Sequence, residues 1–247
     1  MDVPRIDVLG YPMADLSLAA AAEHLLSTIP AVEPYLVFTP NPEMVEAASR
    51  DPRLREALLD ADLLLADGVG IVWASGILNR PLPEVVPGVD LLERLLGAEV
   101  GTRIFLLGTT EENVAAAARN MAQRYPGIEV VGRHHGYFPD REAHRILDLV
   151  GAADPDLVVL GMGVPRDQLF LAGYREHLPA ALYLGVGGGL DVLSGSIRRA
   201  PVLLRKLHLE WLYRLIASPA RWRRQLALPR FVWRVLRARL AAGSSLR

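Results

Sequence analysis

Short apolar runs alternate with longer amphipathic segments along most of the 247-residue chain. The longer segments carry apolar residues at helical spacing, and we expect helices over 41–50, 111–125 and 141–153. The short runs are apolar nearly throughout, as strands buried on both faces are. This alternation predicts an α/β fold, with a mostly parallel sheet and helices on both faces. The expected strands are 35–39, 62–66, 103–108, 128–132, 156–161 and 181–186.

Glycine and polar residues gather where five of these strands end. Ligands of open parallel sheets bind outside the carboxyl ends of the strands. Small residues there let backbone N–H groups approach a ligand, and helix N-termini favour anionic groups. Five such loops on one edge predict a ligand that carries phosphate, such as a nucleotide. The loops are 39–43, 67–70, 108–112, 161–165 and 185–191.

Asp67 ends the apolar run of the second predicted strand and is followed by Gly68. A carboxylate in this place can act as a general base, a metal ligand or a ribose-binding group. The structural alternative is an N-cap for a helix that begins near Val69. In the loop before it, Thr39 and Asn41 are candidates either to cap the next helix or to hydrogen-bond a sugar.

Charge is divided unevenly along the chain. Residues 198–247 hold 13 of the 27 Lys and Arg residues and one of the 28 acids, so this segment has a formal charge of +12 and residues 1–197 have −13. Such a basic segment predicts an anionic partner, which can be phosphate, a membrane surface or nucleic acid. The alternative is that the segment folds onto the acidic body.

The last amphipathic segment, 230–240, carries Arg230, Arg234 and Arg237 along one face and mainly apolar residues elsewhere. A basic helix with aromatic residues is typical of a membrane surface. The alternative is a terminal helix that packs on the core.

Several classes of protein have little support in this sequence. There is no cysteine, so disulfides and thiolate metal sites are excluded. The first ten residues do not resemble a signal peptide, and no apolar stretch reaches the length of a spanning helix. We therefore expect a cytoplasmic protein. The histidines lack metal-ligand spacing, no P-loop occurs, and nothing indicates a hydrolase triad or a nucleic-acid-binding fold.

Three stretches resemble the WecG/TagA/CpsF glycosyltransferases, and the resemblance runs from about residue 8 to residue 224. They are TPNPEMVEAASRDPRLREALLDADLLLADGVGIVWASGILNRPLPEVVPGVDLL, GVGGGLDVLSGSIRRAP and LEWLYRLIASPARWRR. The resemblance implies a Rossmann-like catalytic domain over 1–197 and a basic helical appendage over 198–247. It implies inverting transfer of a hexose or N-acetylhexosamine from a UDP-sugar, without metal or cofactor. The implied acceptor is a polyprenol-diphosphate-linked saccharide of cell-envelope or exopolysaccharide synthesis.

The same resemblance assigns roles to single residues. Asp67 matches the general base, and Thr39 matches a polar residue beside the reacting centre. Arginines of the appendage match those that stabilise the departing UDP, and Asp191 matches a uridine contact. With the loops at the strand ends, the expected substrate-binding residues are Asn41, Gly68, Asp90, Gly108, Gly161, Asp167, Gly185, Gly187, Asp191, Arg214, Arg221 and Arg224.

Two positions depart from the family pattern. Val85 stands where members often have an arginine, and Asp167 stands where a substrate-contacting glutamine is expected. The donor sugar is therefore left open, and a catalytically decayed nucleotide-binding regulator is the alternative function. We expect the appendage to contact an anionic membrane surface at the inner face of the plasma membrane. No nucleic-acid partner is expected, and a homo-oligomer is possible.

Overall fold

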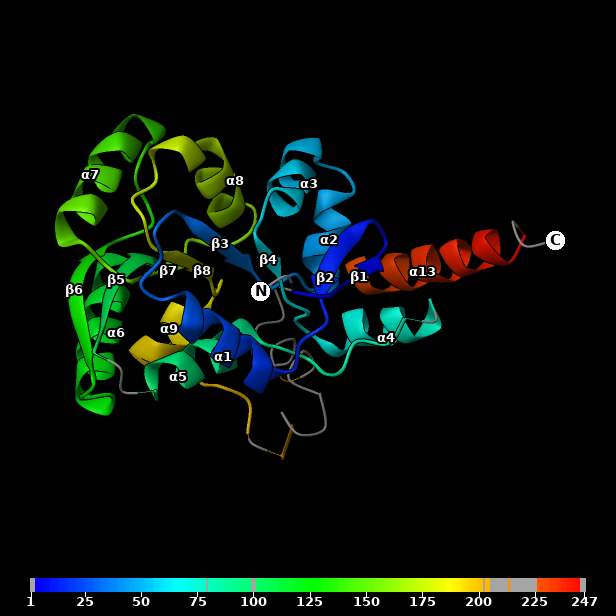
Figure 1. Cartoon of the computed structure of the whole chain (residues 1–247), viewed down its shortest axis with the longest axis horizontal. Helices are drawn as coiled ribbons and strands as arrows, with labels where there is room; N and C mark the ends of the chain where they lie inside the picture. Colours follow the sequence, from blue (N-terminus) through cyan, green and yellow to red (C-terminus); the bar gives the residue numbers. More distant parts are fainter. Residues whose placement is uncertain are drawn as a thin grey trace.

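The computed structural model describes residues 3–78, 80–98, 101–201, 203–204, 213 and 226–244. Within these residues the chain forms one eight-stranded sheet between two layers of helices (Figure 1). The strand order is β1-β2-β4-β3-β8-β7-β5-β6, and only the β1–β2 pair is antiparallel. The predicted mostly parallel α/β sheet is thus confirmed. The strands are β1 Arg5–Val8, β2 Tyr11–Ala14, β3 Tyr35–Phe38, β4 Leu63–Leu64, β5 Thr102–Gly108, β6 Ile128–His134, β7 Leu157–Gly161 and β8 Leu182–Gly185.

All six predicted strands are present, but the sequence analysis missed the first two. β1 and β2 form a hairpin whose turn residues, Leu9 and Gly10, have φ values of 56° and 88°. Positive φ at both central positions is what a two-residue hairpin turn requires. The hairpin joins the sheet where Met13 pairs with Leu64 in parallel. Four-residue strands with exposed positions in β1 carry too little periodicity to be recognised.

The two helical layers enclose two separate apolar cores. In each buried strand, alternate residues enter opposite cores; Val158 and Leu160 of β7 enter one, and Leu157 and Val159 enter the other. This explains why the strands read as continuous apolar runs. The first layer contains α2 Pro42–Ala48, α3 Pro52–Leu59, α4 Val69–Ile77, α7 Ala143–Ala153, α8 Arg166–Gly173 and α13 Ala227–Ser244, and the second contains α1 Leu18–Thr28, α5 Gly88–Leu96, α6 Glu111–Arg124 and α9 Gly189–Ser194.

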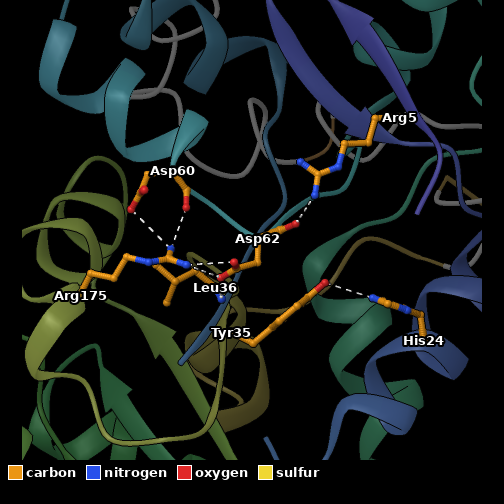
Figure 2. Close-up of polar contacts among 7 residues, drawn as sticks. All are labelled: Arg5, His24, Tyr35, Leu36, Asp60, Asp62 and Arg175. Atoms are coloured by element: carbon orange, nitrogen blue, oxygen red, sulfur yellow. Dashed lines mark hydrogen bonds and ion pairs between the residues drawn. The ribbon is translucent and has the colours of Figure 1, made fainter. Parts of the chain in front are cut away.

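A polar network ties strands together at the amino-terminal edge of the sheet (Figure 2). Arg175, in the short helix η2 Arg175–His177, donates to both carboxylate oxygens of Asp62 at 2.9 and 3.0 Å. It also donates to the backbone carbonyl of Asp60 at 2.7 Å. The Asp62 carboxylate accepts from the Leu36 N–H at 2.7 Å, and its backbone carbonyl accepts from Arg5 at 3.0 Å. These bonds hold the starts of β3 and β4, while the loops at the carboxyl edge lie at the opposite ends of these strands.

The helix α13 packs on the body of the protein through one face. Phe231 and Val235 are buried in the first core, and the Arg234 guanidinium pairs with the buried carboxylate of Glu46 in α2 at 2.9 Å. Core packing, one of the two interpretations considered for this segment, is therefore present. The opposite face carries exposed Trp233 and Leu240. The predicted boundary between residues 197 and 198 stays a prediction, since much of 202–225 lies outside the described residues.

We expect Arg234→Met to lower the free energy of unfolding by about 1–3 kcal/mol, because it takes a charged partner from a buried carboxylate. The matched control is Arg237→Met, whose guanidinium lies 5.3 Å from the exposed Trp233 ring, with an expected change of less than about 0.5 kcal/mol. Urea denaturation of both variants measures the difference. Equal losses in the two variants would contradict a specific role for the Glu46–Arg234 pair.

Candidate functional site

The predicted loops meet at the carboxyl edge of the sheet, where neighbouring strands send their helices to opposite faces. β3 is followed by α2 in the first layer, and the adjacent β8 is followed by α9 in the second. A parallel sheet opens a crevice at such a point, and ligands bind there. The ligand site is therefore expected around the loops that follow β3 and β8.

Asp67 lies in the loop after β4, beside the loop after β3. Its backbone N–H donates to the carbonyl of Pro40 at 3.0 Å, and its side chain is half-buried. α4 is capped by Gly68, with φ of 88° and no side-chain cap bond, so the N-cap role considered for Asp67 is wrong. A Cβ at Gly70 would lie 2.5 Å from the Pro42 side chain. Glycine is therefore required at two positions after Asp67: at Gly68 because φ is positive, and at Gly70 because the Pro42 ring is too close for a side chain.

Thr39 lies at the junction of β3, β8 and the start of α5. Its side chain is buried, and a Cβ at Gly88 would lie 2.9 Å from its hydroxyl oxygen. The same Cβ would lie 3.4 Å from the carbonyl of Gly185 in β8. Asn41 accepts from the Met44 N–H at 2.9 Å and caps α2, which confirms the structural alternative for this residue.

Asp191 forms a second polar cluster with residues that follow β5. Its carboxylate accepts hydrogen bonds from the Thr109 hydroxyl and, at 2.9 Å, from the Asn113 side-chain amide. The Thr109 N–H donates to the carbonyl of Gly161 at 2.9 Å, which joins the loops after β5 and β7. Sequence reasoning identified Asp191 but missed Thr109 and Asn113, whose contact with Asp191 spans about 80 residues of chain.

The glycines of this edge divide into two groups. Gly108 and Gly161 are needed for packing, because a Cβ at Gly108 would collide with the backbone of Gly161, and a Cβ at Gly161 would lie 2.8 Å from Leu190. Gly185 is confined less strictly, because a Cβ there would lie 3.1 Å from the Phe38 ring, which would have to move slightly. By contrast, a Cβ at Gly187 meets no atom within 4 Å. Of these four glycines, Gly187 is the one that leaves room for a ligand against its backbone. Two further glycines of these loops, Gly163 and Gly188, also leave such room.

Asp167 is enclosed in the loop between β7 and α8. Its carboxylate accepts from the backbone N–H groups of Met162 at 2.9 Å and Gly163 at 3.3 Å, and its side chain is 1% exposed. Burial raises the pKa of Asp167 to about 7, although the two backbone hydrogen bonds lower it. The residue shapes the loop from within, and a direct contact with substrate stays a prediction.

Asp90, in the first turn of α5, is paired with a residue that sequence reasoning missed. Arg199 donates to the carboxylate of Asp90 and, at 3.0 Å, to that of Glu93 one turn later. The Arg199 side chain is 13% exposed, so these pairs are well shielded from water. Asp90 and Arg199 both lie in motifs that carry the family resemblance, and this was the signal in the sequence that could have pointed to Arg199. The pair joins the segment after α9 to the helix that faces Thr39.

Arg214, Arg221 and Arg224 lie outside the described residues. The part of the chain that is described contains no group of three or more His, Cys, Asp or Glu side chains placed to hold a metal ion. A cavity of about 410 Å³ lies at the opposite edge of the sheet, between α7 and the segment before β8, and is lined by His144 and His177 among others. It is remote from Asp67 and Thr39.

Comparison with known families covers nearly the whole chain. The model of the family described as glycosyl transferase WecG/TagA/CpsF matches residues 6–245. The chain belongs to this family. It is therefore a glycosyltransferase, as the resemblance implied.

Three curated relatives of this chain carry the same name. A protein of Bacillus spizizenii called N-acetylglucosaminyldiphosphoundecaprenol N-acetyl-beta-D-mannosaminyltransferase is 35% identical over 246 residues, which is 98% of this chain and 94% of the relative. Proteins of the same name from Bacillus subtilis and Staphylococcus aureus are 35% and 32% identical. The alignment with the Bacillus subtilis protein covers 82% of this chain and 79% of the relative. The alignment with the Staphylococcus aureus protein covers 95% of this chain and 93% of the relative. Among the described helices, none is long and apolar enough to cross a membrane.

We expect Asp167→Asn to remove a pH dependence of stability. Because the folded pKa is raised, the neutral carboxyl favours folding at acid pH, and this contribution is lost as pH rises from about 4, the unfolded pKa, through about 7. The variant has no ionisable group there. Relative to the variant, the wild type should therefore lose free energy of unfolding between these pH values and change little above them.

Urea denaturation of both proteins at several pH values measures this difference. A difference between the two free energies that stays constant from pH 4 to pH 8 would show that Asp167 does not titrate in this range.

Proposed function

We propose that this chain transfers a sugar from a UDP-sugar to a polyprenol-diphosphate-linked saccharide, with inversion at the anomeric carbon. The observation that carries the proposal is the position of Asp67. It lies half-buried at the carboxyl edge of the sheet, beside the β3 loop that starts at Thr39, and it does not serve as the cap of α4. Ligands bind at this edge of a parallel sheet, so a carboxylate in this position is placed to take a proton from an acceptor hydroxyl.

In the proposed reaction, Asp67 accepts the proton of the acceptor hydroxyl. The hydroxyl oxygen forms a bond to the anomeric carbon of the donor while the bond from that carbon to the diphosphate breaks. UDP leaves with the electron pair, and the new glycosidic bond has the opposite configuration. Thr39 lies at the junction beside Gly88 and Gly185, where its hydroxyl can hydrogen-bond a sugar at the reacting centre.

The donor nucleotide is assigned to the loop after β8. Gly187 and Gly188 have open space where side chains would stand, so a ligand can approach their backbone. The hydrogen bonds from Thr109 and Asn113 hold the Asp191 carboxylate in one orientation, which suits it to accept hydrogen bonds from uridine. These contacts support a nucleotide rather than a free sugar at this end of the site.

The leaving diphosphate needs positive charge as its bond breaks. We assign this role to Arg214, Arg221 and Arg224, which match the family pattern in the basic appendage. Guanidinium groups bind diphosphate oxygens in bidentate fashion and can neutralise the charge without a metal ion. Metal independence is part of the proposal.

The name of the relatives supports a proposal for the acceptor and for the first donor sugar to test. Their name describes transfer of N-acetylmannosamine to N-acetylglucosamine on diphosphoundecaprenol. We propose the same class of lipid-linked acceptor in cell-envelope synthesis, and UDP-N-acetylmannosamine as the first donor to test. Val85 stands where family members often have an arginine, and the missing guanidinium can change which donor is bound. UDP-activated hexoses and other N-acetylhexosamines are therefore also to be tested as donors. A lipid-linked acceptor also places the +12 appendage at an anionic membrane surface, which we propose is the inner face of the plasma membrane.

A second candidate function is a nucleotide-binding regulator that has lost catalysis. Val85 and the enclosed Asp167 favour it, since both replace side chains that the family pattern assigns to substrate. Asp67 and Thr39 are retained, which favours the enzyme.

We expect Asp67→Asn to lower the turnover number by at least about 10²-fold, because the amide cannot accept the acceptor proton. Affinity for UDP should stay within a few-fold, since the base acts on the acceptor. The matched control is Asp148→Asn, an exposed carboxylate at the opposite edge, with full activity expected. Transfer assays and calorimetric titration with UDP measure both quantities. Normal turnover of the Asp67 variant would remove this residue from the mechanism.

Calorimetric titration of the wild type with UDP in the presence of EDTA tests the nucleotide assignment, with AMP and NAD as controls. We expect metal-free binding that is selective for UDP and weakens in Arg221→Ala. Binding of UDP without transfer of any sugar would favour the regulator. No binding of UDP at millimolar concentration would refute the UDP-sugar transferase and favour the regulator.

A further inference from the structure

The helix α4 begins two residues after Asp67 and exposes an apolar stripe. Val69 and Trp73 are 42% and 38% exposed, and they are one turn apart on the same side of the helix. The other side is buried through Ile71 and Ala74. The sequence of α4, VGIVWASGI, contains no charged residue. A tryptophan partly exposed on an uncharged helix beside the reacting centre is not explained by the core.

The helix α13 exposes a second apolar stripe. Trp233, Leu236 and Leu240 follow helical spacing on the side opposite the buried Phe231 and Val235, and their exposed fractions are 60%, 45% and 75%. Arginine residues stand among them, and the Arg237 guanidinium lies 5.3 Å from the Trp233 ring centroid. α13 contains no acidic residue.

These two helices are neighbours in space although about 150 residues separate them in sequence. They pack against each other, and both project from the same end of the molecule (Figure 1). Apolar side chains and arginines are therefore concentrated on one pair of helices next to the loop that holds Asp67.

We propose that α4 and α13 form one membrane-contacting surface, in which Val69 and Trp73 enter the headgroup–acyl boundary of an anionic bilayer together with Trp233, Leu236 and Leu240. Tryptophan is suited to that boundary because its ring is apolar and its N–H is polar. The arginines of α13 complement anionic headgroups. The proposal rests on the proposed lipid-linked acceptor, and its new element is α4, which belongs to the catalytic body and not to the basic appendage.

Charge favours a bilayer over a second copy of the chain as the occupant. In a two-fold symmetric dimer the same surface meets itself. The surface carries arginines from α13 and no acid from either helix, so like charges would be brought together. An anionic bilayer supplies the opposite charge over the whole surface.

Contact of α4 with the bilayer would set the distance between the general base and the membrane surface. The sugar of a lipid-linked acceptor stays within a diphosphate's length of the headgroups. Trp73 lies about 6 Å along the helix axis from Val69, and Val69 is two residues from Asp67. Docking through α4 would hold the general base beside the membrane plane, where the acceptor hydroxyl is.

The chain has no cysteine, so single-cysteine variants report on single positions. Trp73→Cys, Leu240→Cys and the control Val32→Cys are labelled with the environment-sensitive fluorophore NBD; Val32 is 94% exposed in the segment between α1 and β3. Vesicles of phosphatidylcholine with phosphatidylglycerol are then added to full-length protein. We expect the emission to shift to the blue at positions 73 and 240 but not at 32, and much less with phosphatidylcholine alone. Circular dichroism checks that each variant is folded.

A shift at position 240 without one at position 73 would overturn the proposal, because contact would then be limited to α13. A shift at position 73 that grows with protein concentration in the absence of vesicles would also overturn it, in favour of a second copy. In unlabelled protein, we expect Trp73→Ser to weaken vesicle binding about tenfold and Trp73→Phe to restore most of it. Equal binding by wild type and Trp73→Ser would contradict the contribution of this ring.

The fluorescence assay involves no sugar transfer, so its outcome is separate from that of the proposed function. Protein that transfers sugar to an acceptor analogue with a short, water-soluble lipid but shows no shift at position 73 would overturn the docking surface alone. Protein that shows the shift but transfers no sugar would overturn the proposed function and leave the membrane contact established.

Discussion

The site depends on how closely strand backbones approach one another at the carboxyl edge of the sheet. Gly108 and Gly161 end the paired strands β5 and β7, and a Cβ on the first would collide with the backbone of the second. This contact brings the Thr109 N–H to the Gly161 carbonyl and the Thr109 hydroxyl to Asp191. The polar cluster assigned to the nucleotide is thus held together by backbone packing that only glycine permits.

On the other side of the crevice, the same kind of constraint sets the position of the proposed base. Gly88 brings the start of α5 against Thr39 and β8, and Gly70 brings α4 against Pro42. Asp67 is held between these contacts by its backbone bond to Pro40. The loop that carries the carboxylate is therefore packed against the β3 loop through both Pro40 and Pro42, and such packing favours accurate placement of a proton acceptor.

Charge links this centre to the last part of the chain. The Asp90–Arg199 and Glu93–Arg199 pairs attach the segment after α9 to α5, and the Glu46–Arg234 pair attaches α13 to α2. In these contacts, arginines of the basic segment pair with carboxylates of the acidic body, so part of the opposite charge of the two segments is neutralised within the fold. The outer face of α13 is the part of this segment that we propose contacts an anionic membrane surface.

The sequence by itself determined six of the eight described strands, the helices α2, α6, α7 and α13, and the place of Asp67 at a strand end, because continuous apolar runs and helical periodicity are local properties. It also identified the family, through motifs two of which include loops at the carboxyl edge. Only the tertiary structure decided which glycines pack and which leave room for a ligand, since that depends on atoms from other strands. The same holds for the β1–β2 hairpin, for the pairing of Asp90 with Arg199 and for the enclosure of Asp167. The physical reason is that these features depend on contacts that form when distant segments pack together, and no local periodicity encodes them.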